Sequence, residues 1–416
     1  MKNYTNNYTN NKALKLKILN IIRNEGPCTK QKIAIKLSLN ITTISNLINN
    51  LCKDSNLLIE MGDANSSGGR KPRLYQINEK IGYVVGINIG SKNTIIIISS
   101  LLGNIISNLI EKTDFEKNGD EIIDQVVTLT NKLILETNID KKDILGFGVG
   151  VSGCIDARDG YVLFCPYING LKNLPLKSIL EAKFNNSVFI DDSVRCMAVA
   201  EKKFGFGKEY NNFIFVGIGK GIGSGIYIDG KIYRGDTGAV GEIGHVTVKE
   251  DGPVCSCGNR GCLEIIASET GIIRRTLEGI ENGIHTSISP DNVTVESISK
   301  AAEEGDKFAY DIINKTGEYI GIAISTELNL FGSELVILGG SVSKSGEILF
   351  SAINRTIKLR ALNAITKRVK IMRTELDRRI PAIGASVIIT DELFENSSIN
   401  IIDNLGKLKW VESIKN

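Results

Sequence analysis

One histidine and three cysteines with the spacing of metal ligands fall within eighteen residues of this 416-residue chain: His245, Cys255, Cys257 and Cys262. One imidazole and three thiolates form the soft tetrahedral set that Zn²⁺ prefers in closed structural sites. The chain has only two histidines, so the presence of one at this place favours a metal site. The sequence therefore predicts a structural zinc loop, with unmetallated cysteines or a redox pair as the alternatives.

Glycine-rich turns that could hold phosphate groups follow three apolar segments, at Gly90, at Gly217–Gly225 and at Gly339–Gly340. Backbone amides at such turns can cradle phosphates, although a glycine after a strand is most often only a turn. The first turn lies in the stretch "VGINIGSKNT", where a strand runs into a glycine turn and out again. Asn88 stands there in the place of a carboxylate that would hold a metal, so the stretch resembles a phosphate-binding hairpin with one residue changed.

The elements that must position these residues are apolar strands separated by helical stretches, from residue 81 onward. Candidate strands have the ranges 83–89, 93–99, 144–151, 187–190, 212–218 and 334–340. Continuous apolar runs punctuated by glycine predict an α/β body with a largely buried sheet. The isoleucine-rich stretch 84–110 contains Lys92 and four asparagines, so we expect buried strands there and no membrane span.

Charge is distributed unevenly along the chain, although the net charge is only +3. Residues 1–80 hold 13 Lys and Arg against 5 Asp and Glu, whereas the remainder holds 37 against 42. A basic front on an acidic body indicates that the front contacts an anion.

The eight cysteines are too sparse for a disulfide framework, and the first residues lack the apolar core of an export signal. We therefore expect a reduced, cytoplasmic protein.

The basic front contains three predicted helices, of which the third has one apolar and one polar face. The first covers 12–25, and the second follows Thr29, a suitable N-cap. After a turn at 38–40, the polar face of the third helix presents Thr42, Thr43, Ser45, Asn46 and Asn49. This geometry places a recognition helix in the major groove, where Asn can bond adenine and Thr can contact a thymine methyl.

A basic loop between two strand-like segments, 57–61 and 74–77, completes a winged arrangement. It carries Arg70, Lys71 and Arg73 beside glycines and a proline. A loop of this composition can contact phosphates or enter a narrow, AT-rich minor groove. A helical protein-interaction module with a solvated basic loop is the alternative, but the helices, the wing and the local charge together favour DNA binding.

The run "GIGKGIGSGIYIDGKIYRGDTGAVGEIGH", followed by "CSCGNRGCLE", resembles the signature of the ROK family, which includes repressors and sugar kinases. The resemblance extends from the front domain through "VSGCIDARDGYV" to "RRIPAIGAS". It implies an α/β protein in which a winged helix-turn-helix precedes a two-lobed, actin- and hexokinase-like body, a duplicated ribonuclease H-like fold. It also implies that the histidine and three cysteines hold a structural zinc ion beneath a sugar site.

We expect three domains with the following boundaries. Residues 1–80 form the winged helix-turn-helix with its basic wing and hinge. Residues 81–192 form the first lobe, completed by the C-terminal segment 390–416. Residues 193–389 form the second lobe, with the zinc loop and the sugar site. The family motifs, carried over residue by residue, imply sugar contacts by Asp192, Ser193, Glu242, His245 and Glu264.

The sequence departs from the kinase motifs of the family at the positions that matter for catalysis. Kinases open with a pattern like "DIGGTK", so Asn88 replaces an Asp and Lys92 a Thr, while Lys220 replaces a Thr in the second phosphate loop. Ungapped alignment of "FIDDSVRCMAVAEKKFG" puts Ser193 at the catalytic Asp, and a Ser hydroxyl cannot take a proton as a carboxylate does. A slip of one residue would instead make Asp192 the base.

These features predict a sugar-responsive transcriptional repressor with a non-catalytic, kinase-like body. Its partners would be double-stranded operator DNA, a sugar or sugar-phosphate effector, and further copies of itself in a homodimer or higher oligomer. An ATP-dependent sugar kinase with an added DNA-binding domain is the first alternative. A repressor controlled by a protein partner, with a vestigial pocket, is the second. The sequence leaves open which sugar binds, which operator is read and whether the ligand induces or co-represses.

Overall fold

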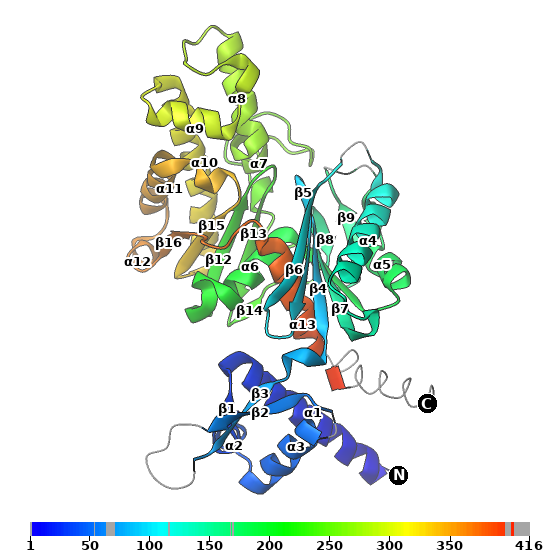
Figure 1. Cartoon of the computed structure of the whole chain (residues 1–416). Coiled ribbons are helices and arrows are strands. Elements are labelled where there is room, and N and C mark those ends of the chain that lie inside the picture. The colour runs from blue at the N-terminus through cyan, green and yellow to red at the C-terminus, as the bar shows by residue number, and fades with distance from the viewer. Residues whose placement is uncertain are drawn as a thin grey trace.

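The computed structural model describes residues 2–53, 55–63, 71–114, 117–166, 168, 170–395 and 401–402. A small domain lies at one end of the molecule, and two α/β lobes lie beyond it (Figure 1). Within these ranges, no helix combines the length and the apolar character that crossing a membrane requires. The expected α/β class, with a winged helix-turn-helix before a two-lobed body, is confirmed.

The N-terminal domain consists of three helices and a small antiparallel sheet of order β1-β3-β2. Its elements are α1 (Lys2–Glu25), β1 (Cys28–Thr29), α2 (Lys30–Leu37), α3 (Ile41–Lys53), β2 (Leu58–Asp63) and β3 (Arg73–Ile77). The first helix begins earlier than the predicted start at residue 12. The sequence did not predict β1, which is two residues long and pairs with β3.

Local side-chain bonds explain why the helix-turn-helix forms where it does. Thr29 caps α2, since its hydroxyl accepts the amide N–H of Lys32. Ser38 adopts a left-handed conformation that ends α2. Asn40 then starts α3, because its Oδ1 accepts the amide of Thr43 at 2.7 Å. The predicted apolar face of α3 is buried as expected, through Ile44, Leu47, Ile48 and Leu51.

The two lobes repeat one topology, as a duplicated fold requires. In each five-stranded sheet, an antiparallel meander is followed by two parallel strands, giving the orders β11-β7-β4-β5-β6 and β14-β13-β12-β15-β16. The first sheet consists of β4 (Tyr83–Ile89), β5 (Asn93–Ser100), β6 (Ile105–Lys112), β7 (Ile144–Val151) and β11 (Val188–Asp192). The second consists of β12 (Phe213–Ile218), β13 (Ile222–Ile228), β14 (Lys231–Ile232), β15 (Leu335–Gly339) and β16 (Lys370–Arg373).

Helices cover the outer faces of both sheets and bury their apolar residues there. On the first sheet these are α4 (Gly119–Glu136) and α5 (Leu176–Phe184), beside a small sheet of β8 (Cys154–Asp156), β9 (Tyr161–Phe164) and β10 (Lys172–Leu174). The second lobe has α7 (Leu263–Ala267), α8 (Glu269–Glu281), α9 (Val295–Glu303), α10 (Lys307–Phe331), α11 (Gly346–Arg360) and α12 (Asn363–Thr366).

Two helices, α6 (Ser193–Phe204) and α13 (Ile380–Glu395), pack between the sheets and share one core cluster. Glycines allow α13 to approach the first sheet closely. A Cβ at Gly86 or Gly148 would lie only 2.1 Å or 1.8 Å from a backbone carbonyl oxygen of that helix. The regularly spaced glycines of the predicted strand 144–151 are therefore needed for contact between a helix and the sheet.

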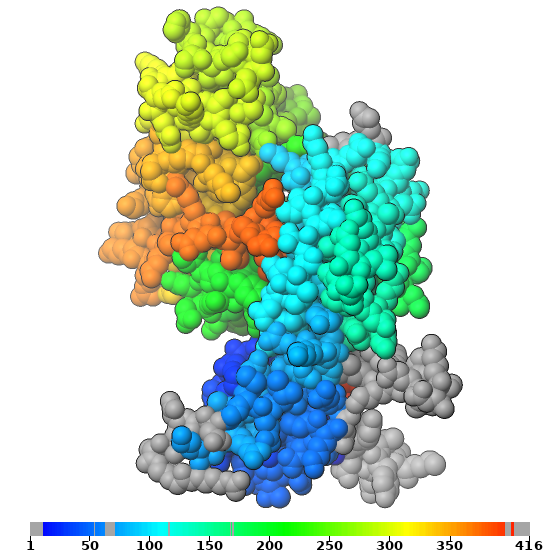
Figure 2. All heavy atoms as spheres, viewed as in Figure 1, coloured from blue at the N-terminus to red at the C-terminus, as the bar shows by residue number. Residues whose placement is uncertain are grey.

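The N-terminal domain shares a hydrophobic core with the body instead of being joined only by a linker. Buried side chains of α1 and α3 belong to the same cluster as Val84 of β4 and as Ile389, Leu393 and Phe394 of α13. Arg23 of α1 forms a 2.6 Å ion pair with Asp391. In Figure 2, the blue atoms of the domain lie directly against the cyan atoms of the first lobe.

All six strands predicted in the body are present, but others were missed. The stretch Gly217–Gly225 was expected to be a turn, whereas the hairpin turn is only 219–221 and the following glycines lie within β13. The reason is packing, because a Cβ at Gly225 would lie 2.5 Å from the Cβ of Ala198 on α6. Strand β6 was also missed, because polar residues interrupt its apolar pattern on the half-exposed edge of the sheet.

Candidate functional site

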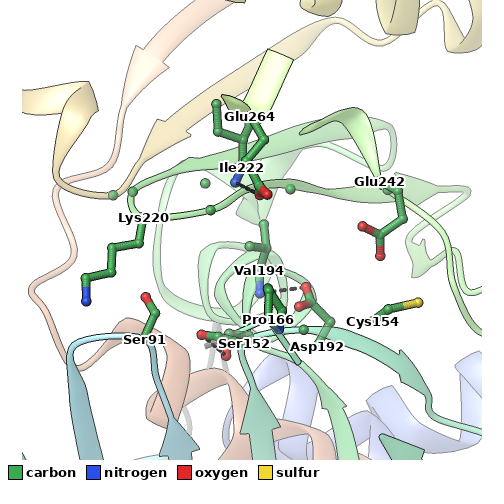
Figure 3. A pocket seen from close by; sticks show the side chains of 18 of the residues that line it. Ser91, Ser152, Cys154, Pro166, Asp192, Val194, Lys220, Ile222, Glu242 and Glu264 are labelled. Carbon is green, nitrogen blue, oxygen red and sulfur yellow. Dashed lines mark hydrogen bonds between the residues drawn. The ribbon is translucent and has the colours of Figure 1, made fainter. Parts of the chain in front are cut away.

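A pocket with a volume of about 170 Å³ lies between the two lobes. Side chains from both lobes line it, including Ser152 and Cys154 from the first and Lys220, Glu242 and Glu264 from the second. Figure 3 shows Ser91 and Lys220 at one end of the pocket, and Glu242 and Cys154 at the other. The pocket thus joins the carboxylate-bearing loops to the glycine turns. All five residues predicted to contact sugar line it: Asp192, Ser193, Glu242, His245 and Glu264.

The predicted metal ligands come together beside this pocket. One ligand atom from each of His245, Cys255, Cys257 and Cys262 lies within 4.8 Å of all the others. The sulfurs of Cys257 and Cys262 are 3.7 Å apart, as are Cys255 Sγ and His245 Nδ1. Zn–S bonds of about 2.3 Å in a tetrahedron would separate two sulfurs by about 3.8 Å, so the donor set fits a tetrahedral metal. A disulfide does not explain the cluster, since all eight cysteines are free.

His245 lies between the cysteine cluster and the pocket. Its Nδ1 faces Cys255 and its Nε2 lies 4.0 Å from Glu242 Oε2. The short helix Ile243–His245 is held to the cysteine loop by a backbone bond from Leu263 N to Val246 O. The imidazole can therefore coordinate a metal through one nitrogen while the other is directed toward a ligand in the pocket.

Glu242 presents its carboxylate from the residue before the short helix Ile243–His245, and Glu264 presents its own from α7. Glu264, near the start of α7, accepts the amide N–H of Ile222 at 2.9 Å, which ties it to β13. Burial raises the pKa of both carboxyls. Burial also raises the pKa of the Cys154 thiol to about 11, with the nearby Glu242 carboxylate adding to the shift, so this thiol is neutral. These groups can donate to and accept from vicinal hydroxyls.

Asp192 lies at the N-terminus of α6 and is half-buried. Its Oδ1 accepts the amides of Val194 and Arg195, at 2.8 and 3.1 Å, so the carboxylate caps the helix. Burial raises its pKa to about 7, with Arg195 opposing the shift and Glu242 adding to it. One Oδ of Asp192 thus serves structure, while the side chain still lines the pocket.

A buried ionic network that the sequence did not predict lies beneath Asp192. Asp191 accepts bonds from Arg195 Nε at 2.5 Å and from Arg234 Nε at 2.9 Å. Burial alone would raise the pKa of Asp191, but the two guanidinium groups lower it. Arg195 also donates to the carbonyl oxygens of Ile155 and Val240, one in each lobe. Each of its three guanidinium nitrogens therefore donates a hydrogen bond within the protein.

The two positions that depart most from the kinase motifs are in contact with each other. Ser193 Oγ donates to Asn88 Oδ1 at 2.7 Å, and Ser152 Oγ lies 3.3 Å from Ser193 Oγ. Asn88 and Ser193 are 4% and 3% exposed, so little of either is available to solvent. Asn88 and Ser193 therefore form a buried, neutral donor–acceptor pair.

Helix α3 lies on the side of the N-terminal domain that is away from the body (Figure 1). Thr42, Asn46 and Asn49 are exposed, while Thr43 and Ser45 are half-buried. Lys30 of α2 donates to Asn49 Oδ1 at 3.1 Å, which adds a cation to this surface. The face could contact a partner without any rearrangement.

The wing strands β2 and β3 pair with an irregularity near their open end, between Glu60 and Asp63. Lys71 and Arg73 are exposed at this end, and Arg73 pairs with Glu60 across the strands. Arg70 lies outside the described residues. Because Arg73 is paired with Glu60, Lys71 is the described cation of the wing that is best placed to contact an anionic partner.

The fold and the pocket define a class of protein in which a winged helix-turn-helix domain precedes a two-lobed, hexokinase-like body. The ROK family model matches residues 84–392, and the chain belongs to the ROK family. It is 33% identical over 384 residues to the xylose repressor of Caldicellulosiruptor bescii, covering 91% of this chain and 96% of that protein. It is 27% identical over 373 residues to the transcriptional dual regulator NagC of Escherichia coli, covering 89% and 91%.

Solved structures show the same fold. A ROK family transcriptional regulator homologous to the E. coli MLC protein matches with a TM-score of 0.82 and 24% identity, covering 94% of this chain and 98% of that one. A ROK glucokinase from Streptomyces griseus, solved with glucose and AMPPNP, matches with a TM-score of 0.65 and 26% identity, covering 74% and 99%. The regulator thus matches nearly the whole chain, whereas the kinase matches about three quarters of it.

Proposed function

We propose that this protein is a sugar-responsive transcriptional repressor that binds operator DNA through α3 and the wing. The observation that carries the proposal is the combination of an exposed polar recognition face with a pocket that gathers Asp192, Glu242 and Glu264. The relatives named as a xylose repressor and as NagC support it, since each aligns over about nine tenths of this chain. Xylose is the first sugar to test.

The pocket chemistry suits a polyhydroxylated ligand. Carboxylates accept bonds from vicinal hydroxyls, and the imidazole of His245 adds a further directional contact. Apolar surface from Phe164 and Pro166 lines the same pocket and can pack against the face of a sugar ring. A sugar in this pocket would contact both lobes. If the lobes can be further apart or closer together, the sugar can change the DNA-binding state only by binding one of these two arrangements more tightly than the other.

We propose that the body does not transfer phosphoryl groups. Such transfer needs a carboxylate to organise metal and phosphates and a base for the attacking hydroxyl. In this chain Asn88 and Ser193 hold each other in a neutral pair. Asp192 would be the base if the alignment slipped by one residue, but its Oδ1 is engaged in capping α6.

We propose that the ion held by His245, Cys255, Cys257 and Cys262 is Zn²⁺. The geometry of the donor atoms fits a closed tetrahedral site with no position left for a reactant. Such an ion would stabilise the loop and orient His245 toward the pocket, and it would supply no chemistry of its own. The nearby turn 258–261 has positive φ at both of its glycines, as a tight ligand loop requires.

Helix α6 offers a direct route from the pocket to the DNA-binding domain. It begins at the pocket with Asp192 as its cap, and near its other end, about 18 Å away, Lys203 Nζ contacts Asn24 Oδ1 of α1 at 3.4 Å. A displacement of α6 on ligand binding would therefore move the winged domain. In a homodimer, such a movement would alter the spacing of two recognition helices relative to two half-sites.

The proposal is tested by fluorescence anisotropy on fragments of the DNA upstream of sugar-utilisation genes, with and without added sugars. We expect sequence-specific binding that changes by at least tenfold in the presence of one sugar. The variant Asp391→Asn should keep its sugar affinity but respond less on DNA, because the ion pair with Arg23 is lost. Binding to DNA that no sugar alters would instead favour control by a protein partner.

A further inference from the structure

The three glycine turns that the sequence marked as candidate phosphate sites all contact one residue, Glu269. Lys92, in the turn after β4, places its Nζ 2.7 Å from Glu269 Oε1. Ser341, directly after Gly339–Gly340, donates its hydroxyl to Glu269 Oε2 at 2.9 Å. The amide of Glu269 donates to the carbonyl oxygen of Gly219, in the turn between β12 and β13, at 2.8 Å. Turns far apart in sequence thus converge on a single residue, two of them on its carboxylate and one on its backbone amide.

The contact between Lys92 and Glu269 crosses the cleft between the lobes. Lys92 belongs to the first lobe, whereas Glu269, the first residue of α8, belongs to the second. The side chain of Glu269 is only 16% exposed, and that of Lys92 is 44% exposed. Ser91, which precedes Lys92 in the chain, and Gly219, which accepts the Glu269 amide, both line the pocket. The pair thus lies beside the end of the pocket where Figure 3 shows Ser91 and Lys220.

Further cations lie around the same carboxylate. Burial lowers the pKa of Lys220, the Glu269 carboxylate opposes that shift, and the charges of Lys92 and Lys112 add to it. Lys92 and Lys112, from two other segments, thus lie within electrostatic reach of Lys220. Like charges repel each other, so an anion among these lysines stabilises their arrangement. The anion that the protein itself supplies here is Glu269.

We propose that Glu269 is a built-in anion that occupies a phosphate position beside this end of the pocket and, through Lys92, holds the lobes together there without a bound nucleotide. The carboxylate takes one donor from each lobe, Lys92 Nζ and Ser341 Oγ, as a bridging phosphoryl group would. It follows that the wild-type site is closed to phosphate groups and that removal of the carboxylate opens it. This inference does not depend on which sugar or operator the protein binds.

Isothermal titration of the full-length protein with inorganic pyrophosphate tests the proposal. We expect no measurable binding to the wild type and a gain of at least tenfold in affinity for Glu269→Ala. The double variant Glu269→Ala/Lys92→Met should lose that gain, because it lacks the bridging cation. The matched control is Glu278→Ala, on the same helix, where the carboxylate pairs with Arg274 at the surface; it should behave as the wild type.

Glu269→Gln keeps the shape of the side chain and guards against a failure of Glu269→Ala to fold. It should also gain pyrophosphate affinity and should increase the radius of gyration in small-angle scattering, because the lobes lose this link. Unchanged pyrophosphate binding in both Glu269 variants would overturn the inference, as would pyrophosphate binding to the wild type. DNA binding measured on the same samples keeps this outcome separate from that of the proposed function.

Discussion

Ser193 Oγ donates a 2.7 Å hydrogen bond to Asn88 Oδ1, and this bond joins the first strand of the body to the first turn of α6. Two ionised carboxylates at these buried positions would repel each other unless a metal ion lay between them or one of them took up a proton. A hydroxyl and an amide need no such ion. Asn88 and Ser193 are therefore complementary to each other, and either one alone would leave a buried polar group poorly matched.

The first prediction concerns catalysis. With ATP, Mg²⁺ and the sugar identified by screening, we expect ADP release no faster than the background hydrolysis of ATP. Loss of a general base typically slows a reaction by about 10² to 10⁴-fold. The amide of Asn88, in place of a carboxylate that would organise metal and phosphates, should slow it further. A coupled ADP-release assay is the measurement. Robust turnover that Asp192→Ala abolishes would show that Asp192 is the base and that the body is a kinase.

The second prediction concerns the bond between Ser193 and Asn88. Ser193→Ala should lower the free energy of unfolding by about 1 to 3 kcal/mol, because it leaves the buried Asn88 Oδ1 without its donor. Urea denaturation followed by circular dichroism measures this change. Ser178→Ala is the control, since that exposed hydroxyl bonds only a nearby backbone carbonyl. Equal stabilities for the two variants would contradict the assigned role.

The third prediction concerns the metal. Elemental analysis should find about one zinc ion per chain, and Cys257→Ser should lose it together with sugar binding, because His245 loses its anchor. Cys52→Ser removes a cysteine in the winged domain, outside the cluster, and should retain the ion. A metal-free wild type that binds sugar normally would rule the zinc site out.

The fourth prediction concerns pH and Glu327, a buried residue of α10 whose Oε1 accepts the hydroxyl of Ser224 at 2.5 Å. Burial raises the pKa of this carboxyl to about 7, although the bond from Ser224 opposes the shift. The folded state thus holds a proton that the unfolded state releases near pH 4.5, so stability should fall as the pH rises from about 4.5 to about 7.

The variant Glu327→Gln should remove this part of the pH dependence. It should match the wild type near pH 4 and be more stable at pH 8, by up to about 3 kcal/mol at 1.36 kcal/mol per unit of pKa. Thermal unfolding across this pH range makes the comparison. A wild-type profile that Glu327→Gln leaves unaltered would show that the carboxyl titrates at its ordinary pKa.

The fifth prediction concerns DNA recognition. Asn46→Ala, on the exposed face of α3, should relax the base preference at one operator position by about 1 to 3 kcal/mol. Competition binding against operator variants is the measurement. Asn363→Ala, an exposed asparagine of α12, is the control and should leave specificity intact. Wild-type specificity in Asn46→Ala would show that this face does not read bases.

Local patterns in the sequence predicted the parts of the site that lie close together in the chain. The metal ligands are confined to eighteen residues, and their gathering is confirmed, while the identity of the ion stays a prediction. The strands of the body and the apolar face of α3 followed equally from short-range periodicity. Glu242 and Glu264 were placed in the pocket by family motifs, because nothing in their immediate sequence distinguishes them from ordinary surface acids.

Contacts between distant segments could not be predicted in the same way. Ser193 and Asn88 are 105 residues apart, and Arg195 bonds carbonyl oxygens 40 and 45 residues away. Only the folded backbone decides which of these groups meet. Glu269 has no motif signal at all, since a glutamate at the start of a helix is favourable for reasons of the helix dipole alone. Its role at the cleft is visible only when three separate turns are seen together.

The hydrophobic core that the winged domain shares with α13 has a consequence for protein engineering. The domain cannot be moved to a new sensor as an independent cassette, because its helices are completed by apolar side chains from near the far end of the chain. A chimeric regulator that carries residues 1–80 alone would expose that surface and aggregate, whereas one that also carries the matching face of α13 would stay folded. Random mutagenesis should likewise recover loss of operator binding from changes in Leu393 and Phe394, more than 300 residues from the recognition helix.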